Sequence, residues 1–407
     1  MSQVQKITED IYWIGANDFS AGRFEKILPI TRGITYNSYF IDDEKTAVID
    51  TVDAHVTDEF LEKTEALLRG RPLDYIIINH MEPDHSSALL ALARLHPETK
   101  LAGSAQALRL FEQFFHCPMK ERYTVTGEKT TIALGRHTLR FLTAPMVHWP
   151  EVTFTYDEKD QVLFSADAFG CFGALQGSVW ADELDYEENY EAEARRYYGC
   201  IVSKYGQQVL AALRKASALD IRILAPLHGP IFRRGEDRKR IMEDTARWAE
   251  WKPEKTGAAL FYTSVYGNTA AAVQSLAWRL REKGAENVKT VDLCRTDMSY
   301  ALADVMTFSH LVFASTTYNM GLFPVMRAFL EGIGDHLVKN RRVALIGNSS
   351  WAPNVAGKIM KEMTAGWKDC ALLAEPVHIL SAPGPAEEKS LDDLAAVIAA
   401  DMAARKE

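Results

Sequence analysis

Long hydrophobic runs, a secretory signal and an excess of basic residues are all missing from this sequence of 407 residues. No apolar run approaches membrane-spanning length, and the first seven residues lack the apolar core of a signal peptide, so we expect a cytoplasmic protein with no membrane partner. There are 46 Lys and Arg against 55 Asp and Glu, a formal charge of -9. Because nucleic acids and anionic membranes select basic surfaces, neither is expected as the main partner. The charge balance does not exclude small neutral substrates.

Cysteine is also scarce. The five cysteines lie far apart and form no C-x-x-C pair: Cys117, Cys171, Cys200, Cys294 and Cys370. This spacing argues against a zinc ribbon, a rubredoxin-type iron centre and a disulfide framework.

A dense group of metal-ligand side chains is the most informative feature present. Two imidazoles and two carboxylates lie within six consecutive positions: His80, Glu82, Asp84 and His85. A polar loop that caps a helix would explain one such residue, but it does not explain four. Mixed imidazole and carboxylate ligation suits iron or zinc, and carboxylates favour harder ions and bridged pairs. The sequence therefore predicts a metal site that could hold more than one ion.

The metal-ligand group is expected on a loop between a strand and a helix. Residues 75–78 form a short β-branched run typical of a buried strand, and Ser86 and Ser87 are interpreted as the cap of a leucine-rich helix. In an extended stretch, the first three ligand candidates would share one side. The turn would then bring His85 back toward the same space.

Three further ligand candidates each follow an apolar run: His148, Asp167 and His228. Any one of them alone is more often a structural residue than a ligand. Together they repeat one position, the loop beyond the end of a strand, where layered folds place their sites.

This pattern resembles the metallo-β-lactamase fold in its flavodiiron form. The motif H-x-E-x-D-H is followed by a distant His, a distant Asp and a His-Gly pair, whereas the commoner zinc hydrolases carry H-x-H-x-D-H and differ at the position of Glu82. The resemblance implies two irons per chain and assigns seven ligands. One iron would be held by His80, Glu82 and His148, the other by Asp84, His85 and His228, with Asp167 bridging the two. In some members of that family, the histidine at the position of His85 lies away from the iron.

A segment rich in acids and aromatics, residues 183–205, lies between Asp167 and His228. Within it, Tyr197 and Tyr198 are candidates for lining the catalytic site. The alternative is an aromatic pair that packs between a helix and a sheet.

The length exceeds what one hydrophobic core usually serves, so two domains are expected. Pro253 and Gly257 stand among charged residues and mark a linker. We predict a metallo-β-lactamase-like αββα sandwich over residues 1–253, of mixed α/β and α+β character. Residues 254–407 are predicted to form a flavodoxin-like doubly wound domain with a five-stranded parallel sheet.

The second domain begins with a buried strand that runs into a hydroxyl-rich loop and then a helix. Hydroxyls and free backbone N–H groups at a helix N-terminus hold phosphate. The loop lacks G-x-G-x-x-G and G-x-x-x-x-G-K-[ST], which leaves a monophosphate. The loops after two later strands each offer backbone amides and an aromatic residue that could bind a flat ring. The order of the three loops along the sequence resembles flavodoxin, and this resemblance implies FMN. The predicted FMN contacts are Thr263, Ser264, Val265, Tyr266, Gly267, Asn268, Thr269, Ser315, Thr316, Thr317, Tyr318, Asn319, Gly321, Asn348, Ser349, Ser350, Trp351 and Ala352.

The family resemblance implies an oxidoreductase that reduces dioxygen to water, nitric oxide to nitrous oxide, or both, with electrons delivered through FMN. No nicotinamide fingerprint is present, so electrons are expected to arrive from another molecule. The resemblance implies a rubredoxin-like protein or a reduced deazaflavin as that donor. The resemblance also implies a head-to-tail homodimer, with a dimer of dimers as a further option. Two alternatives are a binuclear zinc hydrolase fused to a flavodoxin-like domain and an electron carrier with a vestigial first domain.

Overall fold

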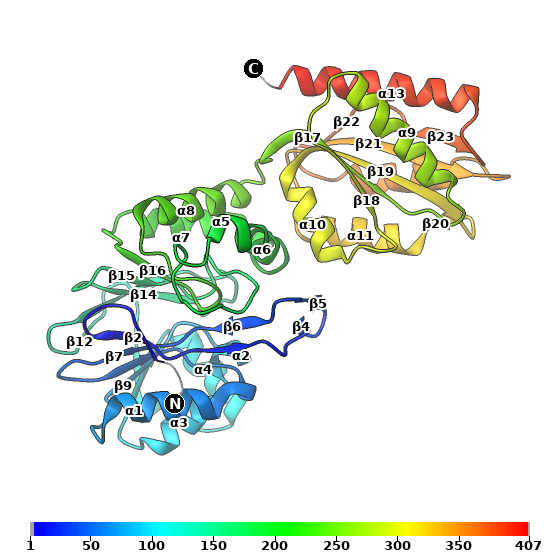
Figure 1. Cartoon of the computed structure of the whole chain (residues 1–407). Helices are drawn as coiled ribbons and strands as arrows, with labels where there is room; N and C mark the ends of the chain where they lie inside the picture. The colour runs from blue at the N-terminus through cyan, green and yellow to red at the C-terminus, as the bar shows by residue number, and fades with distance from the viewer. Residues whose placement is uncertain (1–3, 406–407) are drawn as a thin grey trace. The chain divides into compact units, whose positions relative to one another are not determined.

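The computed structural model describes residues 4–405, which divide between residues 249 and 250 into two compact units (Figure 1). The domain boundary that we predict after residue 253 stays a prediction. Within the described residues, no helix has the length and apolar character needed to cross a membrane.

The first unit is built on two sheets. The larger has the order β1-β2-β7-β8-β9-β10-β11 and the smaller the order β12-β13-β14-β15-β16. The strands of the larger sheet are β1 (Gln5–Lys6), β2 (Ile11–Trp13), β7 (Tyr39–Ile41), β8 (Ala47–Ile49), β9 (Tyr75–Ile78), β10 (Lys100–Gly103) and β11 (Tyr123–Val125). Those of the smaller sheet are β12 (Thr131–Ala133), β13 (Thr138–Thr143), β14 (Thr153–Asp157), β15 (Val162–Phe164) and β16 (Ile223–Ala225). Two small hairpin-like pairs complete the unit, β3 (Ala16–Asp18) with β6 (Ile34–Tyr36) and β4 (Arg23–Phe24) with β5 (Leu28–Pro29).

Helices cover the outer faces of both sheets. Figure 1 shows α1 (Thr57–Leu68) and α3 (Leu89–Leu95) below the first sheet, and α7 (Gly206–Ala216) and α8 (Gly235–Ala249) above the second. The unit also contains the α-helices α2 (Pro83–Ser86), α4 (Ala105–Phe115), α5 (Tyr186–Asn189) and α6 (Glu191–Tyr197), and the π-helix η3 (Tyr198–Val202). Its 3-10 helices are η1 (Ala54–Val56), η2 (Lys120–Arg122) and η4 (Ser203–Tyr205). The predicted αββα layers are therefore confirmed.

Strand pairing brings distant parts of the sequence to one edge of this sandwich. Strands β15 and β16 are parallel neighbours, and Phe164 pairs with Ala225 at their carboxyl ends. Asp167 and His228 each follow three residues later, so the register places both at the same edge.

The second unit is a doubly wound parallel sheet with the order β18-β17-β19-β21-β22, in which β23 also pairs with β21. Its strands are β17 (Lys255–Tyr262), β18 (Val288–Asp292), β19 (Phe308–Tyr318), β21 (Arg342–Ser349), β22 (Ala371–Leu372) and β23 (Val377–Leu380), with a short antiparallel β20 (Gly321–Leu322) on β19. The helices are α9 (Asn268–Glu282), α10 (Met298–Thr307), α11 (Pro324–Asp335), α12 (Val355–Thr364) and α13 (Pro385–Ala403). The predicted flavodoxin-like fold is confirmed.

Candidate metal centre and flavin loops

Of the first four ligand candidates, His80 and Glu82 lie on the loop after β9, whereas Asp84 and His85 lie in a short helix. Helix α2 begins at Pro83, directly after Glu82. The prediction that Ser86 and Ser87 cap the next helix is wrong, because their hydroxyls donate to the carbonyls of Met81 and Pro83. An early helical start is favoured by proline in the first turn, whose fixed φ suits that position.

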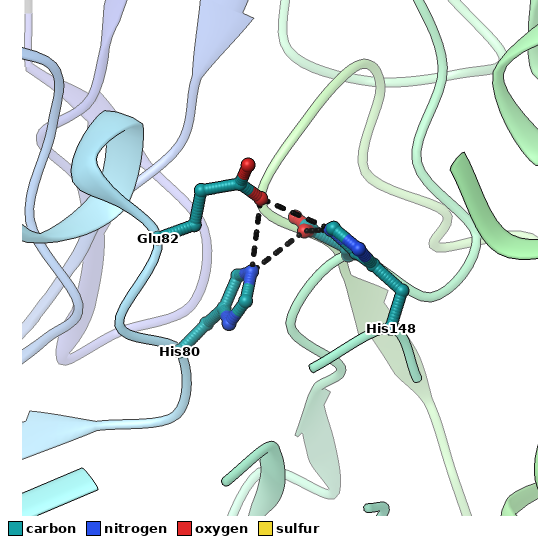
Figure 2. Close-up of side chains that lie close together, drawn as sticks. His80, Glu82 and His148 are labelled. Carbon is teal, nitrogen blue, oxygen red and sulfur yellow. Dashed lines mark hydrogen bonds and ion pairs between the residues drawn. The ribbon is translucent and has the colours of Figure 1, made fainter. Parts of the chain in front are cut away.

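Four of the predicted residues form a first cluster (Figure 2). The Nε2 atom of His80 lies 3.3 Å from Oε2 of Glu82 and 3.1 Å from Oδ2 of Asp167. The Nε2 atom of His148 lies 3.0 Å from the same Glu82 oxygen and 3.1 Å from the same Asp167 oxygen. Two nitrogens and two oxygens from three separate loops thus converge on one point.

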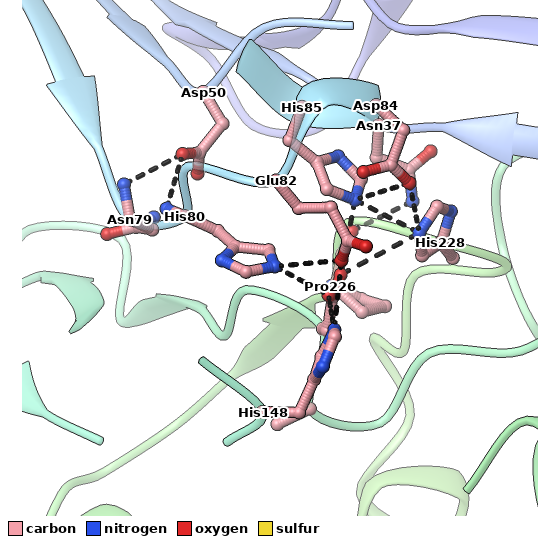
Figure 3. Close-up of polar contacts among 12 residues, drawn as sticks. Asn37, Asp50, Asn79, His80, Glu82, Asp84, His85, His148, Pro226 and His228 are labelled. Atoms are coloured by element: carbon pink, nitrogen blue, oxygen red, sulfur yellow. Dashed lines mark hydrogen bonds and ion pairs between the residues drawn. The ribbon is translucent and has the colours of Figure 1, made fainter. Parts of the chain in front are cut away.

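The other three predicted residues form a second cluster beside the first (Figure 3). The Nε2 atoms of His85 and His228 are 3.0 Å apart, and they lie 3.3 and 3.2 Å from Oδ2 of Asp84. His85 therefore points into the cluster in this structure.

Asp167 stands between the two clusters. Its Oδ2 faces His80 and His148, while its Oδ1 lies 3.2 Å from Nε2 of His85 and 3.7 Å from Nε2 of His228. One carboxylate thus presents one oxygen to each cluster, which is the arrangement that a bridging ligand requires. The roles of the seven residues as ligands stay predictions.

Supporting residues fix the orientation of the imidazoles, and the sequence analysis missed them. Oε1 of Glu151 lies 2.8 Å from Nδ1 of His80, and the carbonyl of Thr35 lies 2.7 Å from Nδ1 of His228. Both partners accept, so each neutral ring donates through Nδ1 and turns the lone pair of Nε2 toward the clusters. Oδ1 of Asp50 accepts from the backbone N–H groups of Asn79 and His80. No local motif marks these residues. The sequence offers one signal, which is that the acid Glu151 follows the ligand candidate His148 by three positions.

The donor set fits metal ions. Nε2 lone pairs face carboxylate oxygens, and both oxygens of Asp84 are buried without a hydrogen-bond partner. An acceptor facing an acceptor is stable only when a proton or a metal cation lies between them. Burial alone would lower the pKa of His148, but the hydrogen bonds to Asp167 and Glu82 outweigh it and raise the pKa to about 9. The centre therefore attracts positive charge strongly.

Aromatic rings enclose the second cluster. The rings of Phe24, Tyr36 and Tyr197 have centroids 5.4, 5.9 and 5.5 Å from that of His228. Of the two candidate tyrosines, Tyr197 thus contacts the centre, whereas the ring of Tyr198 packs 5.5 Å from that of Trp248. A catalytic role for either tyrosine stays a prediction.

One further acid reaches the centre from the hairpin of β4 and β5. Glu25 is exposed as a residue, but partial desolvation of its carboxyl group, and then repulsion by Glu82, raise its pKa to about 7. Sequence analysis missed Glu25, because no pattern links this hairpin to a loop that lies more than fifty residues away.

The predicted flavin loops lie at the carboxyl ends of strands β17, β19 and β21, in the parallel sheet of the second unit. Strand pairing aligns Tyr262 with Ala314 and Ser315 with Gly347, which brings the three loops together. The hydroxyl of Ser264 accepts from the N–H groups of Gly267 and Ala270, and the first turn of a helix leaves further N–H groups free for a phosphate.

Two exposed aromatic side chains mark the rim of these loops. The side chain of Tyr266 is 92% exposed and that of Trp351 is 83% exposed. Large exposed aromatics on polar loops fit the binding of a flat ring. The predicted loop from Ser315 is in part a strand, because β19 continues to Tyr318. The FMN contacts of individual residues stay predictions.

Comparisons with known proteins agree with this geometry. The family model described as ODP family beta lactamase matches residues 34–229. A nitric oxide reductase of Moorella thermoacetica is 31% identical over 95% of this chain and 93% of its own length. An anaerobic nitric oxide reductase flavorubredoxin of Vibrio vulnificus is 30% identical over 88% of this chain and 72% of its own length.

Solved structures are similar over both units. The rubredoxin oxygen:oxidoreductase of Desulfovibrio gigas superposes with a TM-score of 0.93 at 27% identity and covers 99% of each chain. The flavodiiron protein of Giardia intestinalis superposes with a TM-score of 0.91 at 25% identity, over 99% of this chain and 98% of the other.

Proposed function

We propose, from the premise that this chain belongs to the flavodiiron protein family, that it reduces dioxygen to water, nitric oxide to nitrous oxide, or both, at two irons. The observation that carries this proposal is Asp167, whose two oxygens face two separate clusters of ligand atoms. A single-ion site would not need that arrangement. Glu82, in place of a third imidazole, adds negative charge that favours the ferric state needed for redox cycling.

Seven residues would hold the irons, and they divide as the two clusters do. His80, Glu82 and His148 would hold one, Asp84, His85 and His228 the other, and Asp167 would bridge them. When bound, the irons would supply electrons and Lewis acidity to the gas. The protein's part is to fix the ligands through Glu151 and Thr35 and to exclude water with the rings around His228.

Electrons would reach the irons through FMN held by the three loops of the second unit. Reduction of dioxygen to two waters takes four electrons and four protons, and coupling of two nitric oxide molecules takes two of each. FMN and two ferrous ions together store four electrons, so dioxygen can be reduced without release of peroxide. A rubredoxin-like protein is the proposed donor, in line with the names of the flavorubredoxin and rubredoxin oxygen:oxidoreductase relatives, and a reduced deazaflavin is the alternative.

The first experiment is metal and flavin analysis of anaerobically purified protein, followed by turnover with each gas and each donor. We expect iron, FMN and consumption of at least one of the two gases. Glu82→His should shift the bound metal from iron toward zinc and abolish reduction, because the acid that stabilises ferric iron is lost. Two zinc ions in the unaltered protein, with hydrolysis of a thioester or lactam, would overturn the proposal.

A further inference from the structure

A small internal cavity adjoins Asp167 in the first unit. It lies between the loop after β15, the π-helix η3 and helices α7 and α8, and its walls include Asp167, Tyr197, Tyr198, Val209, Thr245 and Trp248. The space open to the centre of a water molecule is about 10 Å³. That volume has room for about one water molecule.

Three residues that line this cavity carry a hydroxyl group with no hydrogen-bond partner among the described residues. They are Tyr197, Tyr198 and Thr245, and all three hydroxyl oxygens are buried. Buried hydroxyls are almost always paired, because an unpaired one loses its bonds to water on folding and gains nothing in return. Three orphaned hydroxyls around one cavity point to a polar occupant.

Thr245 gives the sharpest sign of that occupant. A buried helical threonine commonly donates to the carbonyl four residues earlier, as Thr64 does to Phe60 and Thr364 does to Met360, each at 2.9 Å. Thr245 lies within helix α8 and makes no such bond. Its hydroxyl is therefore free to bond to a molecule in the cavity.

The two tyrosines connect the cavity to the metal centre. The ring of Tyr197 packs against His228, while its neighbour Tyr198 packs against Trp248 of α8. The π-helix starts at Tyr198, and such turns recur at functional sites. The pair thus spans from α8 to the candidate ligands.

We propose that the cavity holds one internal water molecule, which forms a proton relay to the metal centre with the hydroxyls of Tyr198 and Thr245. Water and both hydroxyls donate and accept, so each proton passed toward Asp167 is replaced by one that originates from bulk water, and no relay group is oxidised or left charged. Burial raises the pKa of Tyr198, which keeps this phenol protonated. The relay role rests on the reductase function proposed above, since that reaction consumes protons. The water site does not rest on it.

The test uses the iron- and FMN-loaded protein with Tyr198→Phe, Thr245→Val and the double variant. Thr364→Val is the matched control, because its hydroxyl already donates to a backbone carbonyl in the other unit. A high-resolution crystal structure should contain one ordered water in the unaltered cavity and none in the double variant. The midpoint of thermal unfolding should fall in both single variants, since each loses a hydrogen bond to the water.

Turnover in the double variant should fall at least about tenfold, with a larger solvent isotope effect and unchanged iron and FMN content. The water site is overturned if the unaltered cavity is empty, if the gas occupies it in place of water, or if both single variants raise the unfolding midpoint. Ordered water with unchanged turnover in the double variant overturns the relay alone. A protein that binds the water but reduces neither gas contradicts the proposed function and leaves the water site standing.

Discussion

At the scale of single residues, the candidate metal centre depends on groups that are not themselves predicted ligands. Glu151 accepts from Nδ1 of His80 and from the backbone N–H of Met81, both at 2.8 Å. It therefore fixes both the ring of His80 and the peptide that carries it. Partners of this kind orient the ligand and raise its basicity.

Glu151→Ala should weaken metal binding at the first cluster by about 10- to 100-fold, because His80 loses the acceptor that sets its tautomer. Competition with a chelator of known affinity measures this change. Glu151→Gln keeps an acceptor oxygen and should lose less. Glu158→Gln is the control, since that side chain is half exposed and pairs with Arg140; equal losses in Glu158→Gln and Glu151→Ala would contradict the prediction.

His85→Asn tests the predicted role of His85 as a ligand. Because Nε2 of His85 lies 3.0 Å from Nε2 of His228, we expect the variant to lose about half of its iron, from the second cluster. Iron analysis and Mössbauer spectroscopy measure the loss. His55→Asn, at an exposed histidine, is the control. Full iron content with unchanged turnover in His85→Asn would show that this ligand is not needed.

At the scale of elements, the third predicted flavin loop, residues 348–352, is held where strand β21 lies close to the start of helix α12. A Cβ added at Gly347 would lie 1.8 Å from Oδ1 of Asn354 and 2.7 Å from the nitrogen of Gly357. The same Asn354 oxygen accepts from the N–H of Gly357 and caps helix α12. Strand β21 and helix α12 can therefore come this close only because residue 347 is a glycine and has no side chain.

Gly347→Ala should destabilise the second unit by about 1–3 kcal/mol and weaken FMN binding, because the cap must move to admit a methyl group. Gly332→Ala is the control within helix α11, where an added Cβ meets nothing within 4 Å, and it should stabilise by about 0.5–1 kcal/mol. Urea unfolding and flavin fluorescence measure both effects. An undisturbed Gly347→Ala variant would contradict this account of the loop.

A second element-scale feature is an ion cluster that ties the two sheets of the first unit together. His137 lies between β12 and β13. Its Nδ1 atom is 2.9 Å from Oδ1 of Asp157, and its Nε2 atom is 3.3 Å from Oδ2 of Asp10. Arg136 and Lys159 also bond to Asp10, and Asp43 accepts from the N–H of His137. Both ring nitrogens face carboxylates, so the charged form of His137 is favoured.

Stability should therefore fall as pH rises through the folded pKa of His137. Burial lowers this pKa, but the hydrogen bonds to Asp157 and Asp10 outweigh burial and raise it above 6.5. When the pKa of a histidine is higher in the folded than in the unfolded protein, its charged form stabilises the fold. This stabilisation is complete below the pKa of the unfolded protein and is lost as the pH rises through the pKa of the folded protein. Hydrogen exchange of residues 131–143 between pH 5.5 and 9 measures the change. His137→Gln should flatten this dependence; an unchanged pH profile in that variant would contradict the assignment.

At the scale of the whole molecule, the two predicted sites belong to separate compact units. Electron transfer needs the flavin and the irons to approach closely, and the head-to-tail dimer that the family resemblance implies would supply that approach across a two-fold interface. A dimer of dimers would repeat the same contact.

A mixed dimer tests this arrangement. One chain carries His80→Ala, and the other carries substitutions that disable the loop from Thr263 to Thr269. Transfer between subunits predicts one working pair and about half of the activity of the unaltered dimer. Transfer within a chain predicts none, because neither chain then owns both sites. Each variant homodimer, measured alone, provides the inactive control.

The sequence by itself determined what depends on local pattern. A β-branched run specified β9, an apolar run specified β17, and the spacing of Val273, Leu276 and Leu280 specified the buried face of α9. The identity and order of the ligand types also identified the family, because chemistry restricts which side chains hold a pair of metal ions.

Only the tertiary structure decided how those residues meet. The register of β15 with β16 brings Asp167 and His228 to one edge, and the early start of α2 turns His85 inward. Glu151, Thr35 and Glu25 join the centre through contacts across more than fifty residues of sequence. Long-range pairing of this kind follows from how whole sheets pack and leaves no periodic signal in a short window, so the sequence could not reveal it.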